Sequence, residues 1–135
     1  MDIRFGAGVV IYARDLGQLA RFYAELVALP VVQSEPDFVV LESPACQVVL
    51  VAMPDDIAHR TVITSPPLRR ENVAIKPCFA VSDLAAARRS AIALGGGLGE
   101  PASEWMFRGH RVCDGFDPEG NIFQLRCPAD RVSTA

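Results

Sequence analysis

Apolar residues along the first third of the chain follow spacings that predict a strand, a helix and three further strands. The run from Gly8 to Ala13 is rich in β-branched residues, which favour strands. Asp15 is a good helix N-cap, and the apolar positions after it recur at helical spacing until Pro30 ends the pattern. Three strands are then predicted, at residues 31–33, 38–41 and 47–52. The last of them is so apolar that we expect both of its faces to be buried.

The same order of elements returns in the second half of the chain. A strand is predicted over 74–81, followed by Asp83 as a second N-cap and a helix over 84–94 that a run of glycines ends. Strands are then predicted near residue 98, over 105–116 and over 122–126. The chain therefore contains a β-α-β-β-β pattern twice, and such a repeat is a signal at the level of the fold.

The segment between the two patterns, 54–72, has prolines and mixed charges and no clear periodicity, so we interpret it as a linker with at most a short strand at 61–64. Neither half can bury a curved sheet face alone. We therefore expect a single domain over 1–135, in which module one spans about 6–53 and module two about 73–128.

A cluster of turn-forming residues near the end of the chain predicts a hairpin. Asp117-Pro-Glu-Gly-Asn121 lies between two strand-like segments, and Gly120 or Asn121 can adopt the positive φ that such a turn requires. The second arm of the hairpin places the polar Gln124 among apolar neighbours.

Composition and charge exclude several classes of protein. The 135 residues are 50% hydrophobic and 21% charged, and the net charge of −3 gives no basic surface for nucleic acid. The apolar runs are too short to span a bilayer, and the N-terminus has no signal-peptide pattern, so we expect a cytoplasmic protein. The four cysteines are widely spaced and are expected to be free; a zinc site or disulfides are the weaker alternative.

Two segments carry a resemblance to a known family. The residues Tyr12-Ala-Arg-Asp-Leu16, followed by Arg21-Phe-Tyr-Ala-Glu-Leu26, resemble the opening of vicinal oxygen chelate proteins, the superfamily of glyoxalase I, bleomycin-resistance proteins and extradiol dioxygenases. The segment 117–125 is similar to their closing hairpin, and the resemblance covers about 6–128. It implies an α+β fold in which two βαβββ modules form a half-open, cup-shaped mixed sheet with the helices outside. It also implies a small-molecule site in the cup and, commonly, a homodimer.

In the metal-using members of this superfamily, four side chains in the cup bind a divalent ion, and they are typically His, Glu or Gln. The resemblance places these four positions at Gly8, Leu50, Lys76 and Gln124. Gly8 and Leu50 have no donor atom, and a protonated Lys76 repels a cation. Moving the alignment by one residue in either direction finds no ligand. We therefore expect no metal cofactor.

If the cup is kept without a metal, its lining decides what it binds. Gln124 is expected either to contact a ligand or to be a hydrogen-bonded core amide. Lys76 either replaces the charge of the metal and attracts an anionic or carbonyl-bearing ligand, or extends to solvent near the end of a strand. His110 lacks an orienting partner for a role as a general base. The predicted ligand-binding residues are Tyr12, Phe38, Lys76, Trp105, His110 and Gln124, and the three aromatic ones have ordinary packing as their alternative.

The preferred functional hypothesis is a metal-free protein of the glyoxalase/bleomycin-resistance type that sequesters a small molecule. The first alternative is an enzyme, either a metal-dependent lyase, isomerase or dioxygenase, or one that uses Lys76, His110 or Glu104 for acid–base chemistry. The second alternative is a structural or interaction module with a filled cup. No catalytic residue is predicted, and the expected partners are a small-molecule ligand and a second copy of the chain, with no nucleic acid and no membrane.

Overall fold

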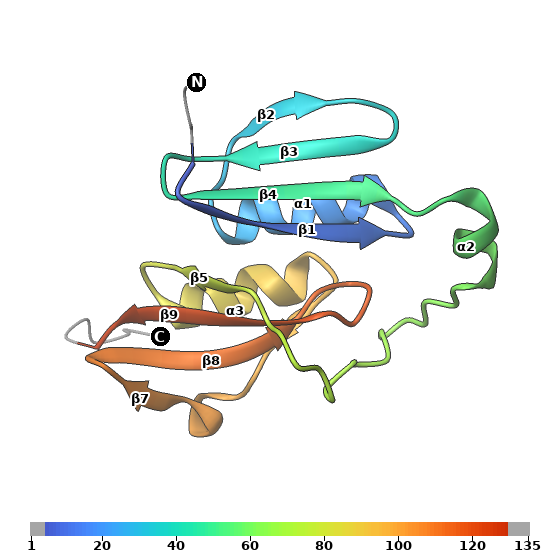
Figure 1. The fold of residues 1–135 in the computed structure, drawn as a ribbon. Coiled ribbons are helices and arrows are strands. Elements are labelled where there is room, and N and C mark those ends of the chain that lie inside the picture. The colour runs from blue at the N-terminus through green and yellow to red at the C-terminus, as the bar shows by residue number, and fades with distance from the viewer. Residues whose placement is uncertain (1–4, 130–135) are drawn as a thin grey trace. The chain divides into compact units, whose positions relative to one another are not determined.

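The computed structural model describes residues 5–129 and divides the chain into two compact units, Met1–Ile63 and Thr64–Ala135 (Figure 1). Each unit has an open mixed sheet and one main helix that packs against it. The predicted α+β class and the β-α-β-β-β order are therefore confirmed.

Unit 1 has a four-stranded sheet in the order β1-β4-β3-β2. β1 and β4 are parallel, and the other neighbours are antiparallel. A short helix, α2 (Asp55–Arg60), lies at the start of the predicted linker, and residues 61–64 form no strand. The elements are β1 (Ala7–Ala13), α1 (Leu16–Leu26), β2 (Val31–Ser34), β3 (Phe38–Glu42) and β4 (Cys46–Ala52).

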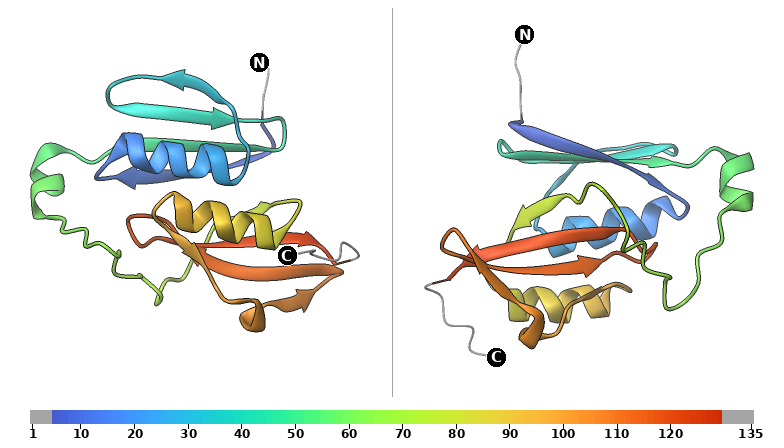
Figure 2. Two further views of the ribbon diagram at one scale, coloured as in Figure 1. Left: turned by 180° about the vertical axis from the view of Figure 1, so that it is seen from behind. Right: turned by 60° about the horizontal axis from the view of Figure 1, so that its bottom comes forward.

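The core of unit 1 lies between α1 and one face of its sheet (Figure 2). Phe22 and Tyr23 of α1 are fully buried, and so are Val48 and Leu50 of β4. The alternate residues of β4 point to the opposite face, and Val49 is only half-buried there. The expectation that β4 is buried on both faces is therefore wrong, because α1 covers one face only.

Unit 2 has a sheet in the order β5-β9-β8-β6, with β7 paired to β8. β5 is shorter than the predicted strand over 74–81. The strand predicted over 105–116 is in fact two strands, because Arg108 and Gly109 form a tight turn with φ of 49° and 77°. The elements are β5 (Cys78–Ala80), α3 (Leu84–Ala93), β6 (Gly97–Leu98), the 3₁₀ helix η1 (Pro101–Ser103), β7 (Trp105–Phe107), β8 (His110–Phe116) and β9 (Ile122–Pro128).

The predicted hairpin is formed by β8 and β9, and the buried Asp117 organises its turn. Its Oδ1 accepts hydrogen bonds from the amides of Glu119 and Asn121 at 2.9 and 3.1 Å, and its Oδ2 accepts one from the Asn121 side chain at 2.9 Å. Gly120 has φ of 85°. The turn sets the register in which Asp114 pairs with Gln124.

Both predicted N-caps are present. The carboxylate of Asp15 accepts a hydrogen bond from the amide of Gln18 at 3.1 Å, and that of Asp83 accepts one from the amide of Ala85 at 2.9 Å. The capped helices have 11 and 10 residues. None of the helices within residues 5–129 is long and apolar enough to cross a membrane.

We expect Asp83→Ala to destabilise the protein by about 1 kcal/mol, because the first turn of α3 loses an acceptor for its amides. Asp83→Ser keeps an acceptor oxygen and should retain most of the stability. Urea unfolding of the two variants and the wild type measures the difference. An unfolding free energy of Asp83→Ala equal to that of the wild type would show that the cap contributes nothing.

All four cysteines are free thiols, as predicted. Cys113 and Cys127 are buried in unit 2, whereas Cys78 is exposed. Cys46 is half-buried in β4, and desolvation raises the pKa of its thiol.

Candidate ligand-binding site

A row of polar side chains crosses the sheet of unit 2 on the face opposite α3. Lys76, just before β5, donates from Nζ to Oδ2 of Asp114 at 2.6 Å. Gln124 donates from Nε2 to Oδ1 of the same carboxylate at 3.3 Å, and its own Oε1 accepts from Nε of Arg126 at 2.9 Å. Alternation along β8 and β9 brings these residues to one face, because their neighbours Cys113, Phe123 and Leu125 are buried on the other.

The ion pair between Lys76 and Asp114 lies at the edge of solvent. Both side chains are 37% exposed, so water screens the attraction and we expect the pair to add about 1 kcal/mol or less to stability. The main effect of the pair is on the charge of the row, because the Lys76 ammonium neutralises the carboxylate of Asp114. Among the described residues, no buried side-chain nitrogen or oxygen lacks a hydrogen-bond partner.

A cavity of about 680 Å³ adjoins this row, and every residue that lines it belongs to unit 2. Its volume is within the range that holds small organic ligands. The lining combines charged, aromatic and small residues: Arg69, Glu71, Lys76, Gly99, Glu100, Ala102, Ser103, Trp105, Asp114, Gly115, Phe116 and Ile122.

Two aromatic residues, Trp105 and Phe116, line the cavity. Trp105 is 41% exposed at the start of β7. The guanidinium of Arg69 lies over the ring of Phe116, 4.1 Å from its centre, and its Nη1 is 3.9 Å from the carboxylate of Glu71. The cavity therefore combines one exposed aromatic surface with several charged groups.

The structure brings together some of the residues that the sequence predicted as ligand-binding. Lys76 and Trp105 line the cavity, and Gln124 lies one hydrogen bond behind it through Asp114. His110 is exposed, does not line the cavity, and contacts the backbone oxygen of Arg108 at 3.1 Å through Nδ1.

The other two predicted residues lie on the sheet of unit 1. Tyr12 of β1 and Phe38 of β3 flank Val51 of β4, because each pairs with it in the register of the sheet. Tyr12 is 60% exposed. The two aromatic side chains therefore share one face of this sheet, and their role in ligand binding stays a prediction.

Sequence reasoning missed several residues of the cavity. Asp114 had a usable signal, since counting back from the Asp117 turn places it opposite Gln124 on the same face. Arg69 and Glu71 had none, because they come from the linker, which has no periodicity. Glu104, considered as an acid or base, is instead held by Arg88 at 2.5 Å and by Arg111 at 3.8 Å.

The observed register corrects one of the four positions compared with metal ligands. Gln124 pairs with Cys78, which lies five residues before the cap Asp83. The residue five before the cap Asp15 is Val10, and it pairs with Val49 rather than Leu50. Leu50 points instead into the core of unit 1, where it is fully buried. Val49 has no donor atom in its side chain either, so this position still cannot bind a metal ion.

The residues at these positions do not fit a divalent metal ion. In unit 2, Asp114 and Gln124 have oxygen atoms suited to one, but the ammonium of Lys76 is 2.6 Å from the Asp114 carboxylate and would repel a cation. In unit 1, Gly8 and Val49 have no side-chain donor atom for a metal. Within residues 5–129, no three His, Cys, Asp or Glu side chains gather in a way that suits a metal.

The repeated βαβββ units have the fold of glyoxalase/bleomycin resistance proteins. The chain belongs to the glyoxalase-like domain family, whose model matches residues 8–126. Among curated protein sequences, none matches this chain.

Solved structures with the same fold have low sequence identity to this chain. A glyoxalase/bleomycin resistance protein/dioxygenase family enzyme from Burkholderia phytofirmans PsJN has a TM-score of 0.66 at 18% identity, over 90% of this chain and 96% of that one. A bleomycin-binding protein complexed with bleomycin has 0.56 at 18%, over 90% and 96%. The oxidase ChaP-H2 has 0.58 at 16%, over 100% and 98%. At these identities the likeness establishes the fold alone.

Proposed function

We propose that this chain binds a small organic molecule in the cavity of unit 2 and that it does so without a metal ion. The observation that carries the proposal is the cavity of about 680 Å³, whose lining combines Trp105 with the lysine ammonium of Lys76. A filled module, the second alternative from the sequence, would have large apolar side chains in this space.

The lining indicates the chemistry of the ligand. The Lys76 ammonium has three N–H donors and gives one to Asp114, so the others are available to an oxygen of a ligand. Trp105 offers apolar surface to a ring, and the Arg69 guanidinium over Phe116 adds a second cation to the lining. A molecule that joins a planar ring to a carboxylate or carbonyl oxygen matches both features.

Lys76 also supports the metal-free part of the proposal. It stands where the resemblance places a metal ligand, and it brings a fixed positive charge to the carboxylate of Asp114. A cation at this place does for a ligand oxygen what a bound metal would do electrostatically, although more weakly.

Binding is favoured over acid–base catalysis by the state of the candidate groups. Glu104 is held in ion pairs, and His110 lies outside the cavity. Of the three groups that the sequence offered for such chemistry, Lys76 alone lines the cavity. The bleomycin-binding neighbour makes bleomycin a reasonable probe for this chain.

The assembly and location of the protein remain predictions from the family resemblance and the sequence. We propose a homodimer in the cytoplasm. Light scattering of the purified protein measures the molar mass, and a value of one chain at micromolar concentration would contradict the dimer.

We expect the emission of Trp105, the only tryptophan, to change when phenylpyruvate or bleomycin is titrated into protein dialysed against EDTA. Phenylpyruvate carries a ring and a 2-oxo acid. Lys76→Met should weaken its binding about tenfold, because a charge-assisted hydrogen bond is lost. The affinity for 2-phenylethanol, which has the ring without the acid, should stay unchanged.

The controls separate the two parts of the proposal. Arg70→Met removes an exposed cation outside the cavity lining and should leave the phenylpyruvate affinity as in the wild type. Metal analysis of the purified protein should find no stoichiometric divalent ion. A bound ion whose removal abolishes binding would overturn the metal-free part, and absence of binding by both probes would overturn the ligand class.

A further inference from the structure

One wall of the cavity is a single segment of chain, residues 99–105. It contributes Gly99, Glu100, Ala102, Ser103 and Trp105 to the lining. The segment runs from the end of β6 through η1 into β7, and most of its side chains are exposed. Hydrophobic burial therefore does little to fix its position.

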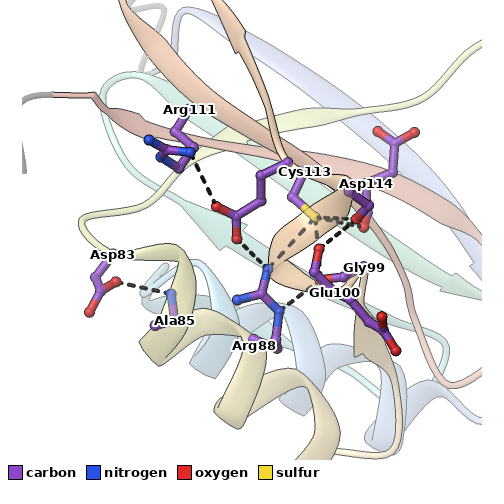
Figure 3. A network of polar contacts seen from close by, with 10 residues as sticks. Asp83, Ala85, Arg88, Gly99, Glu100, Arg111, Cys113 and Asp114 are labelled. Atoms are coloured by element: carbon purple, nitrogen blue, oxygen red, sulfur yellow. Dashed lines mark hydrogen bonds and ion pairs between the residues drawn. The ribbon is translucent and has the colours of Figure 1, made fainter. Parts of the chain in front are cut away.

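Arg88 of α3 holds this segment from behind at two points. Its Nε donates to the backbone oxygen of Gly99 at 2.7 Å, and its Nη2 contacts Oε2 of Glu104 at 2.5 Å. Gly99 and Glu104 lie near opposite ends of the wall. Figure 3 shows Arg88 extending from α3 to Gly99, beside Cys113 on the neighbouring strand.

The contacts are sheltered from water, so solvent screens the charges less than in a surface pair. The side chains of Arg88 and Glu104 are 15% and 9% exposed. A second arginine, Arg111, is 3.8 Å from the other oxygen of Glu104. Ion pairs in such places often add little net stability, because desolvation offsets the attraction. Their geometric constraint remains.

The corner behind the wall is closely packed around Cys113. Its thiol lies 3.5 Å from the oxygen of Gly99 and 3.9 Å from the hydroxyl of Ser103. A Cβ at position 99 would lie 2.6 Å from that hydroxyl and 3.1 Å from the sulfur. The wall therefore has little room to shift while Arg88 keeps both contacts.

We propose that Arg88 is a positioning residue for the cavity, acting through Glu104 and Gly99 to set where Trp105 and Ser103 stand. The inference rests on the proposed function only in that the wall contacts the ligand. The two contacts need two separate nitrogens of one planar guanidinium. Lysine keeps the charge but has a single nitrogen, so Arg88→Lys should release the wall at one of the two points.

Quenching of Trp105 by acrylamide tests, without any ligand, whether Arg88 holds the wall through Gly99 and Glu104. Arg88→Lys and Glu104→Gln should each raise the quenching constant of the native protein about twofold and shift the emission to longer wavelength. Arg89→Lys, on the exposed side of the same helix, should change neither. A residue that only stabilised the fold would lower the unfolding midpoint but leave native Trp105 emission unaltered.

Binding provides the second readout. Arg88→Lys and Glu104→Gln should each weaken phenylpyruvate binding about tenfold, because each releases the wall at one of its two points. Quenching and binding equal to the wild type in both single variants would overturn the proposed role of Arg88. If the wild type binds neither phenylpyruvate nor bleomycin, the proposed function fails. The quenching of Trp105 alone then tests whether Arg88 positions the wall.

Discussion

Gly120→Ala should destabilise unit 2 by about 3 kcal/mol, from strain at positive φ and a broken hydrogen bond. Gly120 has φ of 85°. A Cβ at this position would lie 2.0 Å from the backbone oxygen of Leu68, so the segment around Leu68 must move. That movement would break the hydrogen bond from the amide of Arg70 to the oxygen of Gly120, now 2.9 Å long.

Gly109 offers a matched control for this substitution. Its φ is 77°, close to that of Gly120, but an added Cβ would meet nothing within 4 Å. Gly109→Ala should therefore cost only the conformational term, about 1 kcal/mol. Urea unfolding followed by Trp105 emission measures both variants in the unit that contains them. Equal losses would show that the contact with Leu68 is unimportant.

The same substitution should also affect ligand binding. The segment that Gly120 holds includes Arg69, whose guanidinium covers the ring of Phe116 in the cavity. Displacing it removes one charged group from the lining. We expect the affinity for phenylpyruvate to change in Gly120→Ala. The affinity of Gly109→Ala should remain as in the wild type.

Asp117→Ala should destabilise the protein by about 3 kcal/mol, since the turn loses charge-assisted hydrogen bonds in a buried place. The carboxylate accepts from two backbone amides and from the Asn121 side chain, and the residue is fully buried. With alanine, the amides of Glu119 and Asn121 lose this acceptor. The hairpin would then lose the feature that fixes its register.

Asp117→Asn is the control for this prediction. It keeps one side-chain oxygen for the two backbone amides but loses the charge and the acceptor for the Asn121 amide group. We expect it to lose about half as much stability as Asp117→Ala. Chemical unfolding gives both values. A loss below about 1 kcal/mol in Asp117→Ala would mean that water replaces the carboxylate in the turn.

Local signals in the sequence predicted the elements that depend on neighbouring residues. The caps Asp15 and Asp83 and the turn at Asp117 act over two to four residues, and each is present in the structure. The split of the strand over 105–116 was missed although Gly109 stands at the turn, because Arg108 is not a typical residue for positive φ.

The candidate site depends on contacts between distant parts of the chain. Lys76 was chosen by position and Gln124 by its polar character, but Asp114, which joins them, was not. Lys76 and Asp114 are 38 residues apart in sequence. Alternation shows that two residues of a strand share a face, but it does not show which residue of another strand stands beside them.

The sequence by itself determined the repeated βαβββ order, the caps, the closing hairpin and the poor set of metal donors at Gly8, Lys76 and Gln124. Tertiary structure alone decided which face of β4 is covered, so that Leu50 enters the core and Val49 does not. It also decided that linker residue Arg69 joins the cavity and that Arg88 holds its wall. The reason is physical: caps, turns and strand periodicity arise from short-range backbone geometry, whereas faces and cavities arise from how whole elements pack.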